Sequence, residues 1–110
     1  MSQEQFRNLT EPMYYLLLTL VKPLHGYGIM QEVEERTQGR VKIGAGTLYN
    51  LLARFEEEML IEQVAAEERR KIYQITDKGR KILQAEYERL QLLVQDGKVT
   101  LADGGNQHEA

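Results

Sequence analysis

One segment of the sequence has a clear helical period. Between residues 45 and 58, large apolar side chains recur at the spacing i, i+3, i+4, i+7, at Leu48, Leu51, Leu52 and Phe55. This spacing predicts an α-helix with one face in the core. The opposite face carries small, polar and basic residues, namely Gly46, Thr47, Tyr49, Asn50, Ala53 and Arg54. We therefore expect an amphipathic helix whose outer face is free to contact a partner.

Helices are also expected on both sides of this segment. Thr10 and Thr76 are typical helix-capping residues, and Gly39 and Gly97 are typical helix stops. Two β-prone stretches between the third helix and the last predict a hairpin, with a loop over 66–70. The expected elements are helices over about 11–22, 26–38, 45–58 and 77–95, and hairpin strands over 60–65 and 71–75.

Two of the expected helices carry more apolar surface than one small core needs. The first is apolar nearly all round, and the last has a heptad-like seam with spacings of 4, 3 and 4 residues. These surfaces could pack against each other inside one chain, but two of them on so small a chain favour a homodimer. The predicted interface residues are Tyr14, Leu17, Leu83, Tyr87, Leu90 and Val94.

Composition excludes several classes of protein. The 110 residues suffice for one domain, and without cysteine there is neither a disulfide nor a thiolate metal site. The apolar run over 13–21 is too short to span a membrane, and the first residues lack a secretory signal, so a cytoplasmic chain is expected. His25 and His108 have no companion ligands at metal-site spacing, and Ser2 is the only serine. Neither a metal, a cofactor nor an enzyme activity is expected.

The net charge of −3 hides an uneven distribution. Residues 36–55 carry four bases and no acid, residues 56–68 six acids and no base, and residues 69–81 six bases and one acid. The order helix, helix, helix, hairpin, helix is that of a winged helix-turn-helix. On that fold the basic stretches fall on the third helix and the hairpin, the two elements that contact DNA. The alternatives are solvated faces, or a module that binds an acidic protein.

Several short motifs, in order and at matching separations, resemble the PadR family of bacterial transcriptional regulators. The third helix and the hairpin also carry Leu52, Arg54, Glu56 and Leu60-Ile61 at the family's spacing. The main motifs are His25-Gly26-Tyr27-Gly28-Ile29, Gly46-Thr47-Leu48-Tyr49, and Arg69-Arg70-Lys71-Ile72-Tyr73 followed by Thr76 and Gly79.

The resemblance implies a homodimeric repressor that binds a palindromic operator in double-stranded DNA and is released by a small-molecule effector. Its third helix would enter the major groove and its hairpin, or wing, would follow the backbone or minor groove. The implied DNA contacts are Lys42, Gly46, Thr47, Tyr49, Asn50 and Arg54 at the recognition helix, Tyr27 at the start of the second helix, and Arg69, Arg70 and Lys71 in the wing. For Tyr49 the alternative is packing at the core margin, and for the wing cations it is protection of an edge strand.

Some relatives bind flat hydrophobic compounds between the first and last helices. The corresponding residues are Met13, Tyr14, Tyr15 and Tyr87. Ordinary interface packing is the stronger explanation of these residues, because aromatic residues and methionine are enriched at interfaces.

Two departures from the family pattern concern the wing. Met59 stands where the family usually has glycine, which costs about 1 kcal/mol if its backbone is left-handed. Glu67 and Glu68 would repel a phosphate that they reached.

The expected fold is mainly α with a small β-hairpin. Its four parts are a flexible arm over 1–9, a winged helix-turn-helix domain over 10–76, a dimerisation helix over 77–96 and a disordered tail over 97–110.

Overall fold

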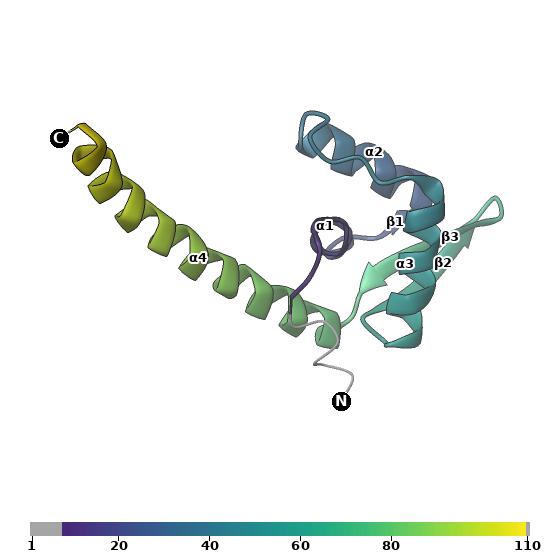
Figure 1. Cartoon of the computed structure of the whole chain (residues 1–110). Coiled ribbons are helices and arrows are strands. Elements are labelled where there is room, and N and C mark those ends of the chain that lie inside the picture. The colour runs from purple at the N-terminus through teal and green to yellow at the C-terminus, as the bar shows by residue number, and fades with distance from the viewer. Residues whose placement is uncertain (1–7, 110) are drawn as a thin grey trace.

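A computed structural model describes residues 8–109, and the side chains of residues 8–102. It confirms a winged helix in which three helices pack around a small antiparallel sheet, while the last helix extends away from the rest (Figure 1). The elements are α1 (Glu11–Thr19), β1 (Leu24–His25), α2 (Gly26–Arg36), α3 (Ala45–Glu57), β2 (Ile61–Glu67), β3 (Arg70–Ile75) and α4 (Asp77–Glu109).

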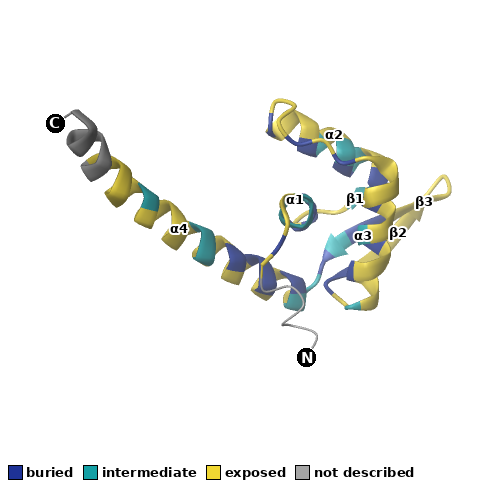
Figure 2. Cartoon of the chain, in the orientation of Figure 1, coloured by how far each residue is buried: buried dark blue, intermediate teal, exposed yellow. Residues whose placement is uncertain are grey.

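The core lies between α1, the inner face of α3, the sheet and the start of α4 (Figure 2). Leu48, Leu52 and Phe55 of the predicted stripe are buried, and Leu51 packs against them at the edge. The apolar face of α1 is largely used inside one chain. Leu17 is 0% exposed, so its predicted place in a dimer interface is wrong. Leu83, at 9% exposed, also belongs mainly to the core.

The sheet contains a third strand that the sequence did not predict. β1 pairs with β3 through Leu24–Tyr73 and His25–Ile72, which gives the strand order β1-β3-β2. Two residues are too few to show a period of two, so no sequence pattern marked this strand. The pairing fixes the start of α2 against the wing.

The hairpin turn is tighter than expected. Glu68 and Arg69 have φ values of 49° and 72°, so a two-residue turn replaces the predicted loop over 66–70. Such turns usually contain Asn-Gly or Gly-Gly, because both central residues need positive φ. Without those residues, the sequence pattern could not predict where the two strands end.

Met59 is left-handed, with φ 66°, as the comparison with the family pattern suggested. It follows the end of α3, where the N–H of Met59 donates to the Glu56 carbonyl at 3.0 Å and the N–H of Leu60 to the Phe55 carbonyl at 2.8 Å. This pair of bonds is the Schellman arrangement, which satisfies carbonyls at a helix end. It places Leu60 in the core at the entry to the wing.

α4 is much longer than the sequence suggested. Thr76 caps it as predicted, since its hydroxyl oxygen accepts the N–H of Gly79 at 3.0 Å. The helix then continues through Gly97 to Glu109, so the predicted stop at Gly97 and the predicted disorder over 97–109 are wrong. A glycine stops a helix when it takes a left-handed conformation, whereas Gly97 keeps negative φ and only lowers helix propensity.

The residue Leu9, just before the α1 cap, is held against α4. Leu9 was expected in the flexible arm but is buried, and its N–H donates to Oε2 of Glu86 at 3.2 Å. Thr10 caps α1 as predicted, by accepting the N–H of Met13 at 3.3 Å. The rest of the predicted arm, residues 1–7, lies outside the described residues. Within the described part of the chain, every helix is too short or too polar to cross a bilayer.

Candidate nucleic-acid interface

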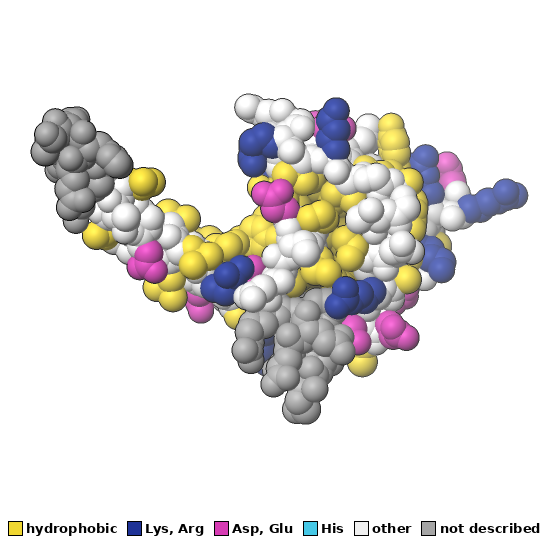
Figure 3. All heavy atoms as spheres, in the orientation of Figure 1, with side chains coloured by type: hydrophobic (Ala, Val, Ile, Leu, Met, Phe, Trp, Pro, Cys, Tyr) yellow, Lys and Arg dark blue, Asp and Glu magenta, His cyan; other side chains and the backbone are white. Residues whose placement is uncertain are grey.

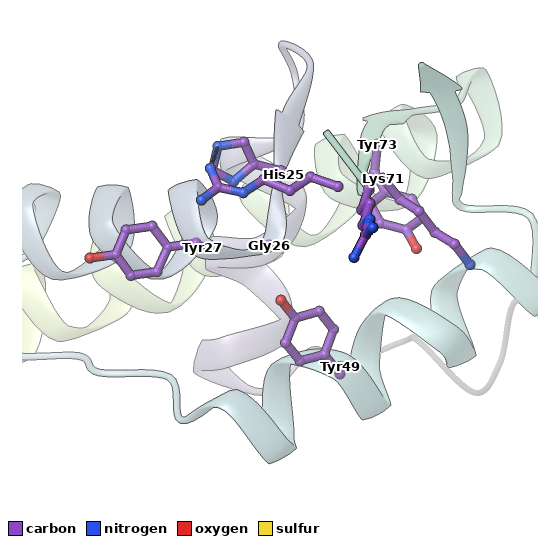
Figure 4. A pocket seen from close by; sticks show the side chains of 8 residues that line it. His25, Gly26, Tyr27, Tyr49, Lys71 and Tyr73 are labelled. Carbon is purple, nitrogen blue, oxygen red and sulfur yellow. Dashed lines mark hydrogen bonds between the residues drawn. The ribbon is translucent and has the colours of Figure 1, made fainter. Parts of the chain in front are cut away.

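A cleft of about 340 Å³ lies between the start of α2, the outer face of α3 and the wing (Figure 4). It brings together five of the predicted DNA-binding residues, from three separate elements. The lining residues are His25, Gly26, Tyr27, Tyr49, Arg69, Arg70, Lys71 and Tyr73.

Tyr49 forms one wall of this cleft. It rises from α3 with its hydroxyl directed at the start of α2, where Gly26 lies (Figure 4). A Cβ atom on Gly26 would lie 2.8 Å from that hydroxyl, so the ring would have to shift to accommodate any larger residue there. The side chain remains 54% exposed, so one edge packs on α2 while the rest faces solvent. Tyr49 thus packs partly at the margin of the core, as the alternative interpretation predicted, and is also accessible to a partner.

Tyr73 forms the floor of the cleft and is buried. Burial raises the pKa of its phenol above the ordinary value, with smaller contributions from Glu56 and Tyr49. Tyr73 therefore stays protonated, and it contributes no negative charge to the cleft.

The outer face of α3 is open to solvent. Gly46, Thr47, Asn50 and Arg54 are all exposed, and a Cβ on Gly46 would meet nothing within 4 Å. The N-cap of α3, Gly44, provides no side-chain cap. Backbone at the start of this helix is thus accessible to an anion or to a groove edge.

The wing supplies unpaired positive charge. Arg69, Arg70 and Lys71 are exposed, and within residues 8–102 none of them forms an ion pair with a carboxylate. Basic side chains gather around the tip of the hairpin in Figure 3. Glu67 and Glu68 sit at the end of β2 and in the turn, and neither lines the cleft. The acids thus lie outside the cleft that the three cations face.

Lys42 lies apart from this cleft. It borders a neighbouring groove that Tyr27 also lines, and its Nζ is 4.0 Å from a carboxylate oxygen of Glu34. Tyr27 therefore connects the two depressions, while Lys42 is separated from the wing cations.

Comparison with known proteins agrees with this arrangement. The model of the PadR-like family of transcriptional regulators matches residues 16–85. This chain belongs to the PadR-like family. The match covers the end of α1, every element from β1 to β3 and the first part of α4, so the family assignment includes the cleft.

Solved structures of transcriptional regulators, two of them described as PadR family or PadR-like, have the same fold. A transcriptional regulator from Clostridium thermocellum is 28% identical with a TM-score of 0.71, over 78% of this chain and 88% of that one. A PadR-like regulator from Bacillus cereus is 25% identical with a TM-score of 0.69, over 82% and 90% of the two chains. A PadR family regulator from Eggerthella lenta is 28% identical with a TM-score of 0.66, over 93% and 88%.

Curated relatives add sequence similarity without a function. One is protein X of Lysinibacillus sphaericus, described as uncharacterized, which is 38% identical over 72 residues, or 62% of this chain and 66% of that protein. Another is an uncharacterized 37.1 kDa protein of transposon Tn4556 from Streptomyces fradiae, 36% identical over 64 residues. That match covers 58% of this chain and 18% of the transposon protein, so this chain spans only part of the length of each relative.

A second groove of this PadR-like chain, about 330 Å³ in volume, lies between α1 and α4. It brings Tyr14 and Tyr87 together, but Met13 and Tyr15 do not line it, so the predicted effector residues are divided. The Tyr14 and Tyr15 rings pack edge to face at 6.0 Å. Burial, followed by Tyr87, Tyr15 and Glu86, raises the pKa of Tyr14. The groove is therefore aromatic and uncharged on its α1 side.

Beyond this groove α4 exposes apolar side chains. Leu90 is partly buried and Val94 is 69% exposed. Because the helix does not stop at Gly97, the predicted seam continues at its 3- and 4-residue spacing to Gly97 and Leu101. The exposed apolar residues of this stretch are Tyr87, Leu92, Leu93, Val94, Val99 and Leu101.

A buried carboxylate, which the sequence pattern did not predict, lies where α4 leaves the core. The Glu86 carboxylate is 2% exposed and accepts hydrogen bonds from Nε and Nη2 of Arg89, at 2.8 and 2.6 Å, and from the backbone N–H of Leu9. The hydrogen bond from Arg89 is the main reason that the pKa of Glu86 lies below its ordinary value, and burial opposes it. Only the fold brings Leu9 to this position, 77 residues away in sequence.

Proposed function

We propose that this PadR-like chain is a dimeric, DNA-binding repressor that acts in the cytoplasm and works by binding rather than by catalysis. The observation that carries the proposal is the cleft. It joins the outer face of α3 to three wing cations that no described carboxylate neutralises. DNA supplies the matching anionic groups at regular spacing, and a helix of this kind fits the major groove.

In this proposal the elements have separate roles. The exposed face of α3, with Thr47, Tyr49 and Asn50, reads base edges in the major groove. Arg69, Arg70 and Lys71 contact phosphates, which fix the position of the protein without reading sequence. Gly46 allows the backbone of α3 to approach the DNA closely, and Arg54 and Lys42 extend the contact to flanking phosphates. Tyr27 contacts the backbone from the start of α2.

The dimer part of the proposal rests on α4. Its exposed apolar side chains run along one helix: Tyr87 borders the groove beside Tyr14, and those from Leu92 to Leu101 are more than half exposed. A second copy would cover them, and its two-fold symmetry would match an inverted-repeat operator. An aromatic or hydrophobic effector would bind in the groove that Tyr14 and Tyr87 line, where it could change the angle between the two protomers. Repression would then be relieved by the change in half-site spacing.

The test compares two substitutions on the DNA site that the wild-type chain selects. Tyr49→Ala should weaken binding to this site more than binding to random DNA, because it removes a contact on the reading face. Arg70→Ala should weaken both about equally and lower the slope of log affinity against log salt by about one. Equal losses for the two variants on both DNAs would contradict the assigned roles. A salt-independent interaction would contradict DNA binding itself and favour an acidic protein as the partner.

A further inference from the structure

The imidazole of His25 has a contact on each ring nitrogen. Nδ1 accepts the backbone N–H of Gly28 at 3.0 Å and so caps α2. Nε2 lies 3.3 Å from Nη1 of Arg70 on β3. The pairing of His25 with Ile72 holds this geometry, since Ile72 is two residues along the strand from Arg70. His25 therefore connects the start of the second helix to the base of the wing.

These two contacts cannot both be hydrogen bonds. A neutral imidazole has one N–H donor and one acceptor nitrogen. While Nδ1 accepts from Gly28, the proton lies on Nε2 and faces the guanidinium of Arg70, whose nitrogens only donate. The other tautomer would accept from Arg70, but it would turn an N–H toward the N–H of Gly28 and remove the cap. In the first tautomer two donors, Nε2–H of His25 and Nη1 of Arg70, lie 3.3 Å apart in the lining of the cleft without an acceptor between them.

An oxygen that accepts from both donors would resolve this conflict. Within residues 8–102, no carboxylate forms an ion pair with Arg70. The Tyr49 hydroxyl and Lys71 line the same cleft, which opens to solvent. A phosphate oxygen combines negative charge with several lone pairs, and hydrogen bonds from charged donors to phosphate are strong. Of the ligands that this DNA-binding surface would meet, a backbone phosphate is the one that fits.

We propose that the Nε2–H of His25 and the guanidinium of Arg70 together bind one phosphate of the DNA backbone. The inference rests on the proposed DNA-binding function and adds a contact from the start of α2. It also gives His25 two roles, because the cap on Gly28 is what directs the Nε2 proton toward the DNA. A purely structural His25 would cap the helix and leave DNA affinity unchanged.

His25→Asn separates the two roles. Asparagine is among the best N-cap residues, so the variant keeps the cap but loses the outward N–H. We expect an unchanged melting temperature and about a fivefold to tenfold loss of affinity for the selected site. The salt slope should stay as in the wild type, because no charge is removed, whereas Arg70→Ala should lower it. In the Arg70→Ala background His25→Asn should cost much less, because the two donors share one phosphate.

Replacing single phosphates of the site by uncharged methylphosphonates locates the contact. One position in each half-site should weaken the wild type and have little further effect on His25→Asn. The phosphate site is overturned if His25→Asn binds with wild-type affinity, or if the losses of affinity from His25→Asn and Arg70→Ala simply add in the double variant.

If His25→Asn does not fold, ¹⁵N spectra of wild-type His25 replace it. These spectra should show the proton of the free protein's His25 on Nε2. The Nε2 signal should shift on DNA binding only when the contacted phosphate is charged. A proton on Nδ1 would overturn the site. A wild type that binds no DNA would overturn the proposed function, whereas wild-type binding without these effects would overturn the His25 site alone.

Discussion

Residues 77–86 and residues 87–102 of α4 belong to one continuous helix but have different surroundings. In the first stretch Ile82, Leu83 and Glu86 are buried, and Gly79 packs on the backbone of Leu60. In the second, Leu90 is partly buried and the other large apolar side chains are exposed to solvent (Figure 2). The sequence pattern is similar in the two stretches, because the heptad-like seam continues from Leu83 to Val94 without a break. One seam therefore has two surroundings: its start completes the core, and in the proposed dimer the rest would contact the second copy.

The largest difference between the two stretches should appear at their glycines. A Cβ on Gly79 would overlap the carbonyl oxygen of Leu60 and lie 2.7 Å from Cγ1 of Ile75, and backbone cannot move aside easily. We expect Gly79→Ala to destabilise the fold by about 2–4 kcal/mol, as severe overpacking does. Urea unfolding measures this. A loss below about 0.5 kcal/mol would show that the start of α4 does not pack on Leu60 as described.

The second prediction concerns association. Val94→Asp places a carboxylate on the exposed seam, and in a dimer two of these would be buried without a partner, which costs several kcal/mol. We expect the dimer dissociation constant to rise more than a hundredfold while the monomer fold is kept. Sedimentation equilibrium and circular dichroism measure the two properties.

Val64→Asp is the matched control, because Val64 is an exposed valine on the wing, far from the seam in sequence. It should leave the mass in solution unchanged. A Val94→Asp chain that stays dimeric would mean that α4 does not form the interface.

The third prediction concerns the boundary between the two stretches, at Glu86. Its pKa is lowered in the folded chain, so its ionised form stabilises the fold. This contribution is complete above the ordinary value of 4.5 and is lost as the pH falls through the lower, folded value. We expect Glu86→Gln to cost about 1–3 kcal/mol at pH 7 and progressively less below pH 4.5. Urea unfolding at several pH values measures it, with Glu88→Gln as the exposed control on the same helix. A cost that does not change with pH would contradict the ionised bridge to Arg89 and Leu9.

The smallest effect is expected at Gly97, in the exposed stretch. A Cβ there meets nothing within 4 Å, and alanine is the better helix former. Gly97→Ala should therefore stabilise α4 by about 0.5–1 kcal/mol, and the helical signal in circular dichroism should persist to higher temperature. Destabilisation comparable to that of Gly79→Ala would remove the distinction between the two stretches.

The fold could be predicted from sequence where the signal is periodic and local. The stripe from Leu48 to Phe55 gave the orientation of α3, and Thr10 and Thr76 gave the starts of α1 and α4. Periodicity could not show that α1 buries Leu17 inside its own chain, because an apolar seam looks the same whether it meets the core or another copy.

Other features depend on tertiary structure alone. β1 is too short to have a pattern, and the turn at Glu68 and Arg69 uses positive φ without glycine. Gly97 could not be distinguished from a helix stop, because the outcome depends on its conformation and not on its identity. His25 had no visible role in the sequence, since its neighbour Arg70 is 45 residues away. The residues of the cleft were mostly predictable from the family motifs, but their juxtaposition was not.

Selection of bound sequences from a random pool of double-stranded DNA tests the central claim most directly. A dimer that places α3 in two successive major grooves should enrich an inverted repeat whose half-site centres lie about 34 Å apart, one helical turn. Tyr49→Ala should reduce this enrichment, and Val94→Asp should reduce it to single half-sites or remove it. If a chain that is dimeric in solution enriches no sequence at all, the proposal that the cleft of α2, α3 and the wing reads DNA is contradicted.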